Sequence, residues 1–318
     1  MRTILWTVLT LAMPTASIAA QERQLYVSVQ DSRSMPVAGL GIDSFRVFEN
    51  GKERTIKSVV SRTEPVSVGF VFDMSGTAGA SVVGRDTDLV AASVRHFVKR
   101  LETGSDYFLV GFTDRSVALT EWTGDPKVLA RGLSDLKQLS TNKSGPLFDI
   151  SGEAIKMAAA GKNKKKLLIL FTDGRETNSK QGRNEVIRLA ESAEVTVYSV
   201  GLTDGRSGIF NSPEKSFLER VAWVSGGEAH VLYTSLLFAP IEPVGPGPDG
   251  SASTEVSRMF DRLADQLANQ YIITYSLNPP IPARPAREIN VKLLGTQAIE
   301  KQRGGLAVRF RRKYADAD

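Results

Sequence analysis

The sequence contains no cysteine and only two histidines, His96 and His230. Without cysteine, the chain forms no disulfide and offers no thiolate to zinc, to an iron–sulfur cluster or to nucleophilic catalysis. Two histidines are too few for a site built from several imidazoles. Any metal bound by this chain is therefore expected to be a hard cation, magnesium or calcium rather than zinc, held by oxygen ligands.

A strong excess of charge of one sign is also lacking. The 40 Lys and Arg residues outnumber the 35 Asp and Glu residues only slightly, which gives no case for nucleic-acid binding. Hydrophobic residues make up 42% of the chain, enough for a packed core and against wholesale disorder. A length of 318 residues predicts one large domain with an appendage, or two domains.

The first twenty residues have the organisation of a secretory signal peptide. A positive start at Met1-Arg2 precedes the apolar stretch Ile4 to Met13, and Pro14 leads into small residues that end at Ala20. We therefore predict an exported protein, periplasmic or secreted, whose mature chain starts near Gln21. No later segment is long and apolar enough to predict a membrane span, and an uncleaved N-terminal anchor is the alternative.

Short alternating segments occur at both ends of the remaining chain. Each alternates apolar and polar residues as a half-buried strand does, and Asn50-Gly51 is a strong hairpin signal between two of them. The predicted strands are 24–30, 45–49, 55–60, 271–277, 289–293 and 306–310. We expect the N-terminal segment 21–64 and the C-terminal segment 271–318 to pair into one small all-β unit.

The region between them, 65–270, alternates strands with helices. Val66 to Phe72, Leu167 to Phe171 and Val195 to Val200 are almost continuously apolar, as expected of parallel strands buried on both faces. The predicted fold class is α/β, a doubly wound and mainly parallel sheet, with the all-β unit from both chain ends beside it. A Pro- and Gly-rich loop at 239–253 precedes the last helix of this region.

Two of the buried strands lead directly into oxygen-bearing side chains. The first runs into Asp73-Met74-Ser75-Gly76-Thr77, and the second ends before Asp173. Because the carboxyl ends of parallel strands meet at one edge of a sheet, these oxygens are placed to converge on one cation. Magnesium prefers octahedral oxygen ligands and keeps several waters, so few protein ligands suffice.

These residues resemble the metal-ion-dependent adhesion site of the von Willebrand factor type A domain. Asp73, Ser75 and Thr77 match the Asp-x-Ser-x-Ser of its first loop, with Thr in place of the last Ser, and Asp173 matches the Asp of its third loop. The resemblance implies this domain for 65–270 and a site for Mg²⁺, or alternatively Ca²⁺ or Mn²⁺.

The second loop departs from the pattern of the family. The position of the family's metal-binding Thr falls on Gly145, which has no side chain. Ser144 or Thr141 are alternative hydroxyl donors, and water is another. The resemblance therefore implies a weakened site with both carboxylates retained.

The flanking segments resemble more narrowly an exported group common in acidobacteria. Its members share a Gly-Leu followed by Phe-x-Val-x-Glu-(Asp/Asn)-Gly, found here from Gly39 to Gly51. They also share Asn-Gln-Tyr-x-x-x-Tyr, found at Asn269 to Tyr275, and an Arg-rich strand ending in Tyr, found at Val308 to Tyr314. The resemblance covers essentially the whole chain after the signal peptide.

By this resemblance the protein is a binding or adhesion module and not an enzyme. An Asp or Glu of a protein partner would complete the coordination of the metal, and the last helix of the domain would shift with ligand state. A structural envelope-associated protein with a vestigial metal site is the alternative. The oligomeric state is left open.

A haloacid-dehalogenase-like phosphohydrolase is a further alternative from a different class. Its Asp-x-Asp-Gly-Thr loop resembles Asp73 to Thr77, but Ser75 stands where that mechanism needs a second acid. The chain has neither a Gly-x-Ser-x-Gly elbow nor a Gly-x-x-x-x-Gly-Lys phosphate loop.

Two clusters of basic residues lie outside this site. We expect both to be solvated, the first as gatekeepers before a buried strand and the second as charges on an edge strand, with anion binding as the alternative for the second. The clusters are Lys162, Lys164, Lys165 and Lys166, and Arg309, Arg311, Arg312 and Lys313.

Overall fold

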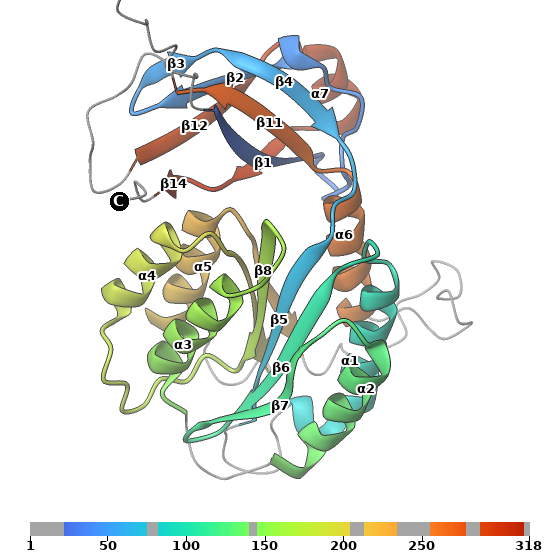
Figure 1. The fold of residues 1–318 in the computed structure, drawn as a ribbon, viewed down its shortest axis with the longest axis vertical. Coiled ribbons are helices and arrows are strands. Elements are labelled where there is room, and N and C mark those ends of the chain that lie inside the picture. Colours follow the sequence, from blue (N-terminus) through green and yellow to red (C-terminus); the bar gives the residue numbers. More distant parts are fainter. Residues whose placement is uncertain are drawn as a thin grey trace, which may run out of the picture.

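The computed structural model describes residues 22–74, 82–139, 145–203, 213–233, 255–277 and 287–314. They form an α/β domain and a smaller β unit that stands at one end of it (Figure 1). The chain begins in the β unit, enters the α/β domain through strand β5 (Val66–Asp73) and returns through helix α6 (Glu255–Ala268). The predicted fold class is thereby confirmed.

The α/β domain is built around a six-stranded sheet with the order β10-β9-β8-β5-β6-β7. All neighbouring strands pair in parallel except β7, which is antiparallel to β6 at the edge. Residues of β5 are buried along its whole length, as the continuous apolar run predicts. The other strands are β6 (Asp106–Phe112), β7 (Ser116–Thr123), β8 (Lys165–Thr172), β9 (Thr196–Thr203) and β10 (Ala229–Tyr233).

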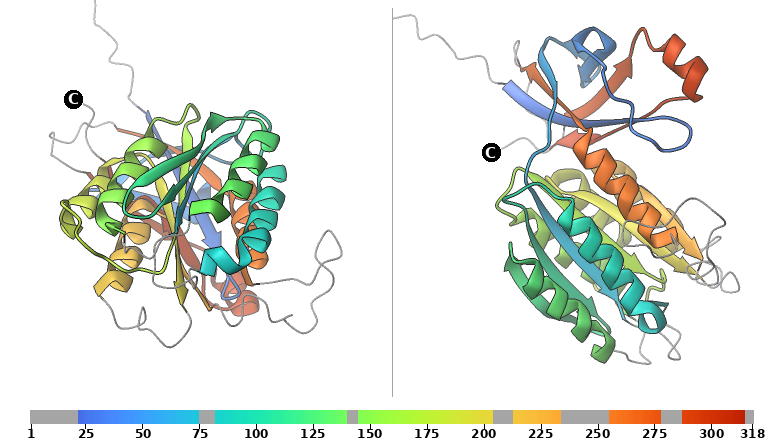
Figure 2. Two further views of the ribbon diagram at one scale, coloured as in Figure 1. Left: turned by 90° about the horizontal axis from the view of Figure 1, so that it is seen from below. Right: turned by 90° about the vertical axis from the view of Figure 1, so that its right-hand side faces the viewer.

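Helices cover both faces of this sheet (Figure 2). Helices α1 (Val82–Lys99), α2 (Pro126–Asp135) and α6 lie on one face, and α3 (Leu147–Ala159), α4 (Arg183–Ser192) and α5 (Pro213–Ser225) on the other. A short helix η2 (Leu136–Leu139) follows α2.

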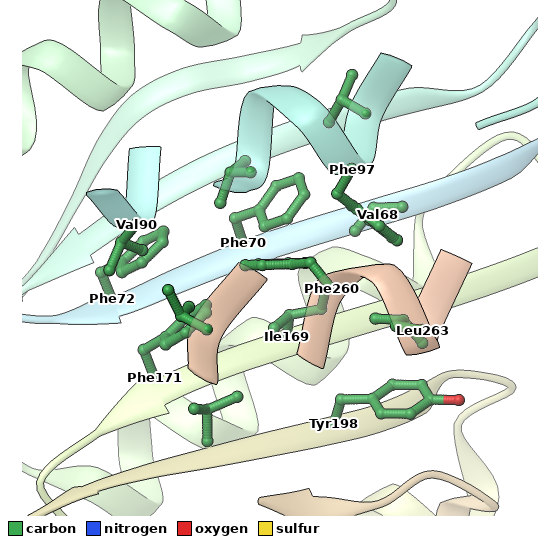
Figure 3. Close-up of a cluster of buried hydrophobic side chains, with 14 of the residues drawn as sticks. Val68, Phe70, Phe72, Val90, Phe97, Ile169, Phe171, Tyr198, Phe260 and Leu263 are labelled. Atoms are coloured by element: carbon green, nitrogen blue, oxygen red, sulfur yellow. The ribbon is translucent and has the colours of Figure 1, made fainter. Parts of the chain in front are cut away.

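Stacked aromatic rings fill the core between the sheet and α6 (Figure 3). Phe72 and Phe171, on the neighbouring strands β5 and β8, stack with ring centroids 4.6 Å apart. Phe260 of α6 lies 6.0 Å from Phe171 and 5.2 Å from Phe97 of α1. These contacts place the last helix of the domain against β8, one of the two strands that lead to the predicted metal site.

The β unit consists of two four-stranded antiparallel sheets, β13-β1-β11-β4 and β14-β12-β2-β3. N-terminal and C-terminal strands pair directly in both, because β1 lies between β13 and β11 and β12 pairs with β2. This pairing confirms the predicted β unit. The strands are β1 (Glu22–Gln30), β2 (Phe45–Glu49), β3 (Lys52–Arg54), β4 (Ile56–Ser61), β11 (Tyr271–Ser276), β12 (Arg287–Leu293), β13 (Ala307–Phe310) and β14 (Lys313–Tyr314).

Two short helices complete the β unit, η1 (Ile42–Ser44) and α7 (Gln297–Arg303). The sequence did not predict α7. Neither helix contains a buried residue, so neither carries the apolar face from which a helix is recognised in a sequence.

The β unit packs against the amino-terminal ends of β8 and β9, and the carboxyl ends of the parallel strands point away from it (Figure 1). Two predictions of solvated basic residues are wrong here. Lys165 is only 7% exposed and donates to the Leu267 carbonyl at the end of α6 over 3.2 Å. Arg311 is 8% exposed and donates to the Val195 carbonyl over 2.6 Å. Both side chains are buried by the contact between the two parts of the chain.

Candidate metal centre

The predicted site lies where the topology of the sheet reverses. From β5 the chain moves to β6 on one side, whereas β8 continues to β9 on the other, so the crevice between β5 and β8 is the switch point. Ligands of open α/β sheets bind outside the carboxyl ends of the strands at such a point. Phe72 pairs with Phe171, which sets Asp73 at the end of β5 next to Thr172 at the end of β8.

Asp73 is a buried carboxylate held by a neighbouring hydroxyl. It is 4% exposed, and its Oδ2 accepts a hydrogen bond of 2.7 Å from the Thr172 hydroxyl. The same hydroxyl oxygen accepts the Gly174 backbone N–H over 2.9 Å. Thr172, which is fully buried, therefore links the end of β5 to the turn that follows β8 and fixes one oxygen of Asp73.

Asp173 begins this turn and stays partly open to solvent. Its side chain is 29% exposed; Oδ1 accepts the Arg175 backbone N–H over 3.0 Å, and Oδ2 lies 3.6 Å from Arg175 Nε. Burial raises the pKa of the Asp173 carboxyl, and Arg175 offsets part of that rise. Gly174 turns the chain with a φ of 76°, a conformation that favours glycine.

The second loop reaches the site at Gly145. A Cβ at this position would lie 2.7 Å from the Thr113 carbonyl oxygen and 3.0 Å from the Phe112 ring, so the backbone here leaves no room for the Thr of the family pattern. The Gly145 carbonyl accepts the Thr177 backbone N–H over 3.3 Å. This hydrogen bond joins the turn that follows β8 to the chain segment at Gly145.

Further hydrogen bonds join the same turn to the start of α3. Glu176 Oε2 accepts the Phe148 backbone N–H over 3.0 Å, which satisfies one of the free donors at the helix N-terminus. The Asp149 carboxylate accepts the backbone N–H groups of Lys180 and Gln181 over 3.0 and 2.7 Å. These bonds fix the position of the turn that carries Asp173.

Of the residues that the sequence predicts for the site, two are described: Asp73 is the last residue of β5, and Asp173 directly follows the neighbouring strand β8. The others, Ser75, Thr77 and Ser144, lie outside the described residues, as does the alternative Thr141. Within the ranges that the structure describes, no group of three or more His, Cys, Asp and Glu side chains is placed to hold a metal.

Sequence reasoning missed the role of Thr172. The hydroxyl stands directly before Asp173 in Phe171-Thr172-Asp173-Gly174, but only the strand register shows that it faces the carboxylate of the neighbouring strand. Its position at the end of a buried strand, where an apolar residue is usual, was the available signal.

The residues present fit a hard divalent cation. Two carboxylates at adjacent strand ends offer the oxygen ligands that such a cation prefers. Asp73 and Asp173 are the described residues that would hold it.

Comparison with known proteins identifies the family. The von Willebrand factor type A domain matches residues 67–236, more than half of the chain, and the chain belongs to this family. The resemblance inferred from the site residues is confirmed, whereas the narrower acidobacterial grouping stays a prediction. Comparison with curated protein sequences gives no match.

Several solved structures are similar in fold at low sequence identity. Proximal thread matrix protein 1 from the mussel byssus is 15% identical with a TM-score of 0.47, over 67% of this chain and 48% of that one. The vWF domain of Mfa5, a type V pili tip protein from Porphyromonas gingivalis, is 14% identical with a TM-score of 0.44, over 64% and 94%. BatB from Bacteroides thetaiotaomicron is 14% identical with a TM-score of 0.42, over 63% and 98%. This chain thus covers about half of the mussel protein.

The described residues also bear on the membrane prediction. Among them, no helix combines the length and the apolar character that crossing a bilayer requires.

Proposed function

We propose that this protein is an exported, non-enzymatic binding module that engages an acidic residue of a protein partner through a divalent cation. The cation is Mg²⁺, with Ca²⁺ or Mn²⁺ as alternatives, and its ligands are Asp73, Ser75, Thr77 and Asp173, with Ser144 as a further hydroxyl. The observation that carries the proposal is the pair of carboxylates at the adjacent ends of β5 and β8, at the switch point of a von Willebrand factor type A domain.

Asp73 and Asp173 contribute differently to the proposed metal site. Asp73, oriented by Thr172, supplies a buried negative charge, and the partly exposed Asp173 supplies a second one toward solvent. When bound, the cation would offer a coordination position to an outside carboxylate. Because that contact is a single charged one, the surrounding loops would provide the rest of the interface and its specificity.

We assign three parts to the chain. Residues 1–20 are the signal peptide, residues 65–270 are the binding domain, and residues 21–64 together with 271–318 are the β unit. The β unit stands at the end of the sheet where β5 begins (Figure 2), whereas Asp73 is the last residue of that strand.

The absence of a metal-binding side chain at Gly145 favours a second candidate function, that of a structural envelope-associated protein whose metal site is vestigial. The close approach of the Thr113 carbonyl excludes the threonine side chain that the family pattern places here. This candidate differs from the first in one measurable respect, because it predicts no dependence of partner binding on a divalent cation. A phosphohydrolase has no such support, since Ser75 replaces its second acid.

The test compares binding in Mg²⁺ and in EDTA. The mature chain is immobilised, envelope proteins retained in Mg²⁺ are identified, and the affinity of each purified partner is measured in both conditions. We expect EDTA to weaken binding at least tenfold, and Asp73→Ala to weaken it as much in Mg²⁺. Asp73→Asn, which keeps the shape and the hydrogen bond from Thr172, separates loss of charge from loss of folding.

Asp43→Ala is the matched control, because Asp43 is an exposed carboxylate on η1 of the β unit. It should bind as the unaltered chain does. Equal affinity with and without divalent cation would reject the proposed function and favour the structural candidate.

A further inference from the structure

A second candidate site lies at the opposite end of the sheet. A cavity of about 630 Å³ is lined by β1 and β11 of the β unit and by the amino-terminal ends of β8 and β9 of the α/β domain. Its volume lies in the range of small-molecule sites. The end of α6 also lines it through Leu267, so two parts of the chain and their connecting helix meet there.

The lining of this cavity is strongly cationic. Six of its residues are basic and two are acidic, although the whole chain is nearly balanced in charge. The basic residues are Arg23, Lys162, Lys164, Lys165, Lys166 and Arg311. Concentrated positive charge in a concave site bordered by protein attracts small anions.

Lys165 is one of the two buried cations among them. It is 7% exposed and donates one hydrogen bond, to the Leu267 carbonyl, so two of its three donors have no protein partner in the described part of the chain. Burial lowers its pKa to about 8, and the charge of Glu64, which lies outside ion-pair distance, offsets part of that shift. An unpaired buried ammonium of this kind is costly without a compensating anion.

The other buried cation, Arg311, is bonded only to neutral groups. Its guanidinium donates to the carbonyls of Ala190, Glu191 and Val195, and no carboxylate lies within ion-pair distance of it among the described residues. Arg23, by contrast, is partly neutralised by Glu49 at 3.4 Å. Lys165 and Arg311 therefore leave two buried positive charges without a carboxylate contact.

Aromatic and amide groups form the rest of the wall. Tyr26, Tyr198 and Tyr314 line the cavity, and the ring of Tyr26 lies 5.7 Å from the Lys165 ammonium. Gln270 donates to Ser28 through Nε2, while its buried Oε1 accepts no hydrogen bond from the described residues. This wall suits an organic body with hydroxyl groups, because rings provide flat contacts and the free amide oxygen accepts a hydrogen bond.

We propose that this cavity binds a small organic anion, with its carboxylate or phosphate groups at Lys165 and its hydroxyl-bearing body against the tyrosines and Gln270. The inference does not depend on the metal site, which lies at the other end of the sheet. It assigns to the junction between the β unit and the α/β domain a ligand that both parts contact.

The test is calorimetric titration of the mature chain without divalent cations at about 150 mM salt, which screens nonspecific attraction. Fructose 1,6-bisphosphate is the phosphate probe, citrate the carboxylate probe and fructose the neutral probe. We expect saturable binding of one or both anions and none of fructose. Lys165→Met should weaken the binding about tenfold or more, through loss of a charge-assisted hydrogen bond.

Two further variants keep the result interpretable. Lys162→Ala with Lys164→Ala removes two exposed charges at the rim and should weaken binding without affecting folding. Lys52→Gln, an exposed lysine of β3 outside the cavity, should bind as the unaltered chain does. Absence of saturable anion binding, or equal binding by folded Lys165→Met, would overturn the proposal.

Discussion

Thr172 and Asp73 form the best-defined side-chain contact at the proposed metal site. The hydroxyl donates to Asp73 Oδ2 over 2.7 Å and both residues are buried, so the carboxylate is held in one orientation. We predict that Thr172→Val lowers the free energy of unfolding by about 1–2 kcal/mol, because it leaves a buried carboxylate oxygen without its donor. Metal affinity should fall as well.

Thr172→Ser is the matched control, since it keeps the hydroxyl. Chemical denaturation and metal titration of both variants measure the two effects. Equal metal affinity in Thr172→Val and Thr172→Ser would show that the hydroxyl does not orient a ligand.

Lys165 makes the stability of the protein depend on pH. Its pKa is lowered to about 8 in the folded state from 10.5, so between these values the unfolded chain binds the proton more strongly than the folded chain. The unfolding free energy contributed by this residue therefore rises as pH increases through 8 toward 10.5, and the burial penalty is fully present below pH 8.

We predict that Lys165→Met raises the free energy of unfolding at neutral pH by up to about 3 kcal/mol, because it removes this penalty. The difference between variant and unaltered chain should shrink as pH rises from 7.5 to 9.5. Denaturation at several pH values in that interval measures it. A difference that does not change with pH would contradict the assignment to Lys165.

Gly145 has no room for a side chain. We predict that Gly145→Thr lowers the melting temperature and does not strengthen metal binding, since its Cβ would meet the Thr113 carbonyl at 2.7 Å. Gly305→Ala, where a Cβ meets nothing within 4 Å, is the control and should leave the melting temperature nearly unchanged. Restored, tighter metal binding in Gly145→Thr would show that the second loop moves to admit the missing ligand.

At the scale of elements, the segment between β13 and β14 joins the β unit to α4 by hydrogen bonds. Arg311 supplies three hydrogen bonds there, to carbonyls at the end of α4 and just beyond it. We predict that Arg311→Met lowers the free energy of unfolding by about 2–4 kcal/mol, because several buried carbonyls lose their donor. Arg303→Met, at a side chain 48% exposed on α7, should have little effect when both are measured by chemical denaturation.

Helix α6 runs along the sheet toward the β unit (Figure 2). Phe260 packs on Phe171 of β8, and the Leu267 carbonyl accepts from Lys165. We predict that saturating Mg²⁺ changes hydrogen exchange in 256–267, because α6 contacts β8, the strand that ends directly before Asp173. Unchanged exchange there, with binding shown independently, would contradict a role of α6 in transmission.

The elements that the sequence predicts well are those whose burial is visible locally. The apolar strands 66–72 and 167–171 and the alternating strands of the chain ends are confirmed, because their patterns follow directly from the faces they bury. The site carboxylates follow from the same strands. Lys165 and Arg311 were assigned to solvent wrongly, because they are buried by segments that are distant in the sequence, which no local pattern reveals.

At the scale of the whole molecule, the two proposed sites lie at opposite ends of one sheet. The carboxylates Asp73 and Asp173 follow the carboxyl ends of β5 and β8, and the basic cavity lies at the amino-terminal end of β8 under the β unit. Opposite charges are thus separated along the sheet, with an anionic site for a cation and a cationic site for an anion. The β unit, assembled from both chain ends, supplies one side of the second proposed site through β1 and β11.

If Asp73 and Asp173 hold a divalent cation, as we propose, thermal stability reports its binding most directly. Melting temperatures of the mature chain are measured in Mg²⁺, Ca²⁺, Mn²⁺ and EDTA, with Asp73→Ala and Asp73→Asn alongside. A cation at about 100 times its Kd stabilises the native state by about 2.7 kcal/mol, so we expect the melting temperature to rise by several degrees in at least one metal, and by nothing in either variant. The same melting temperature in every metal and in EDTA, or an equal rise in Asp73→Ala, would contradict the claim.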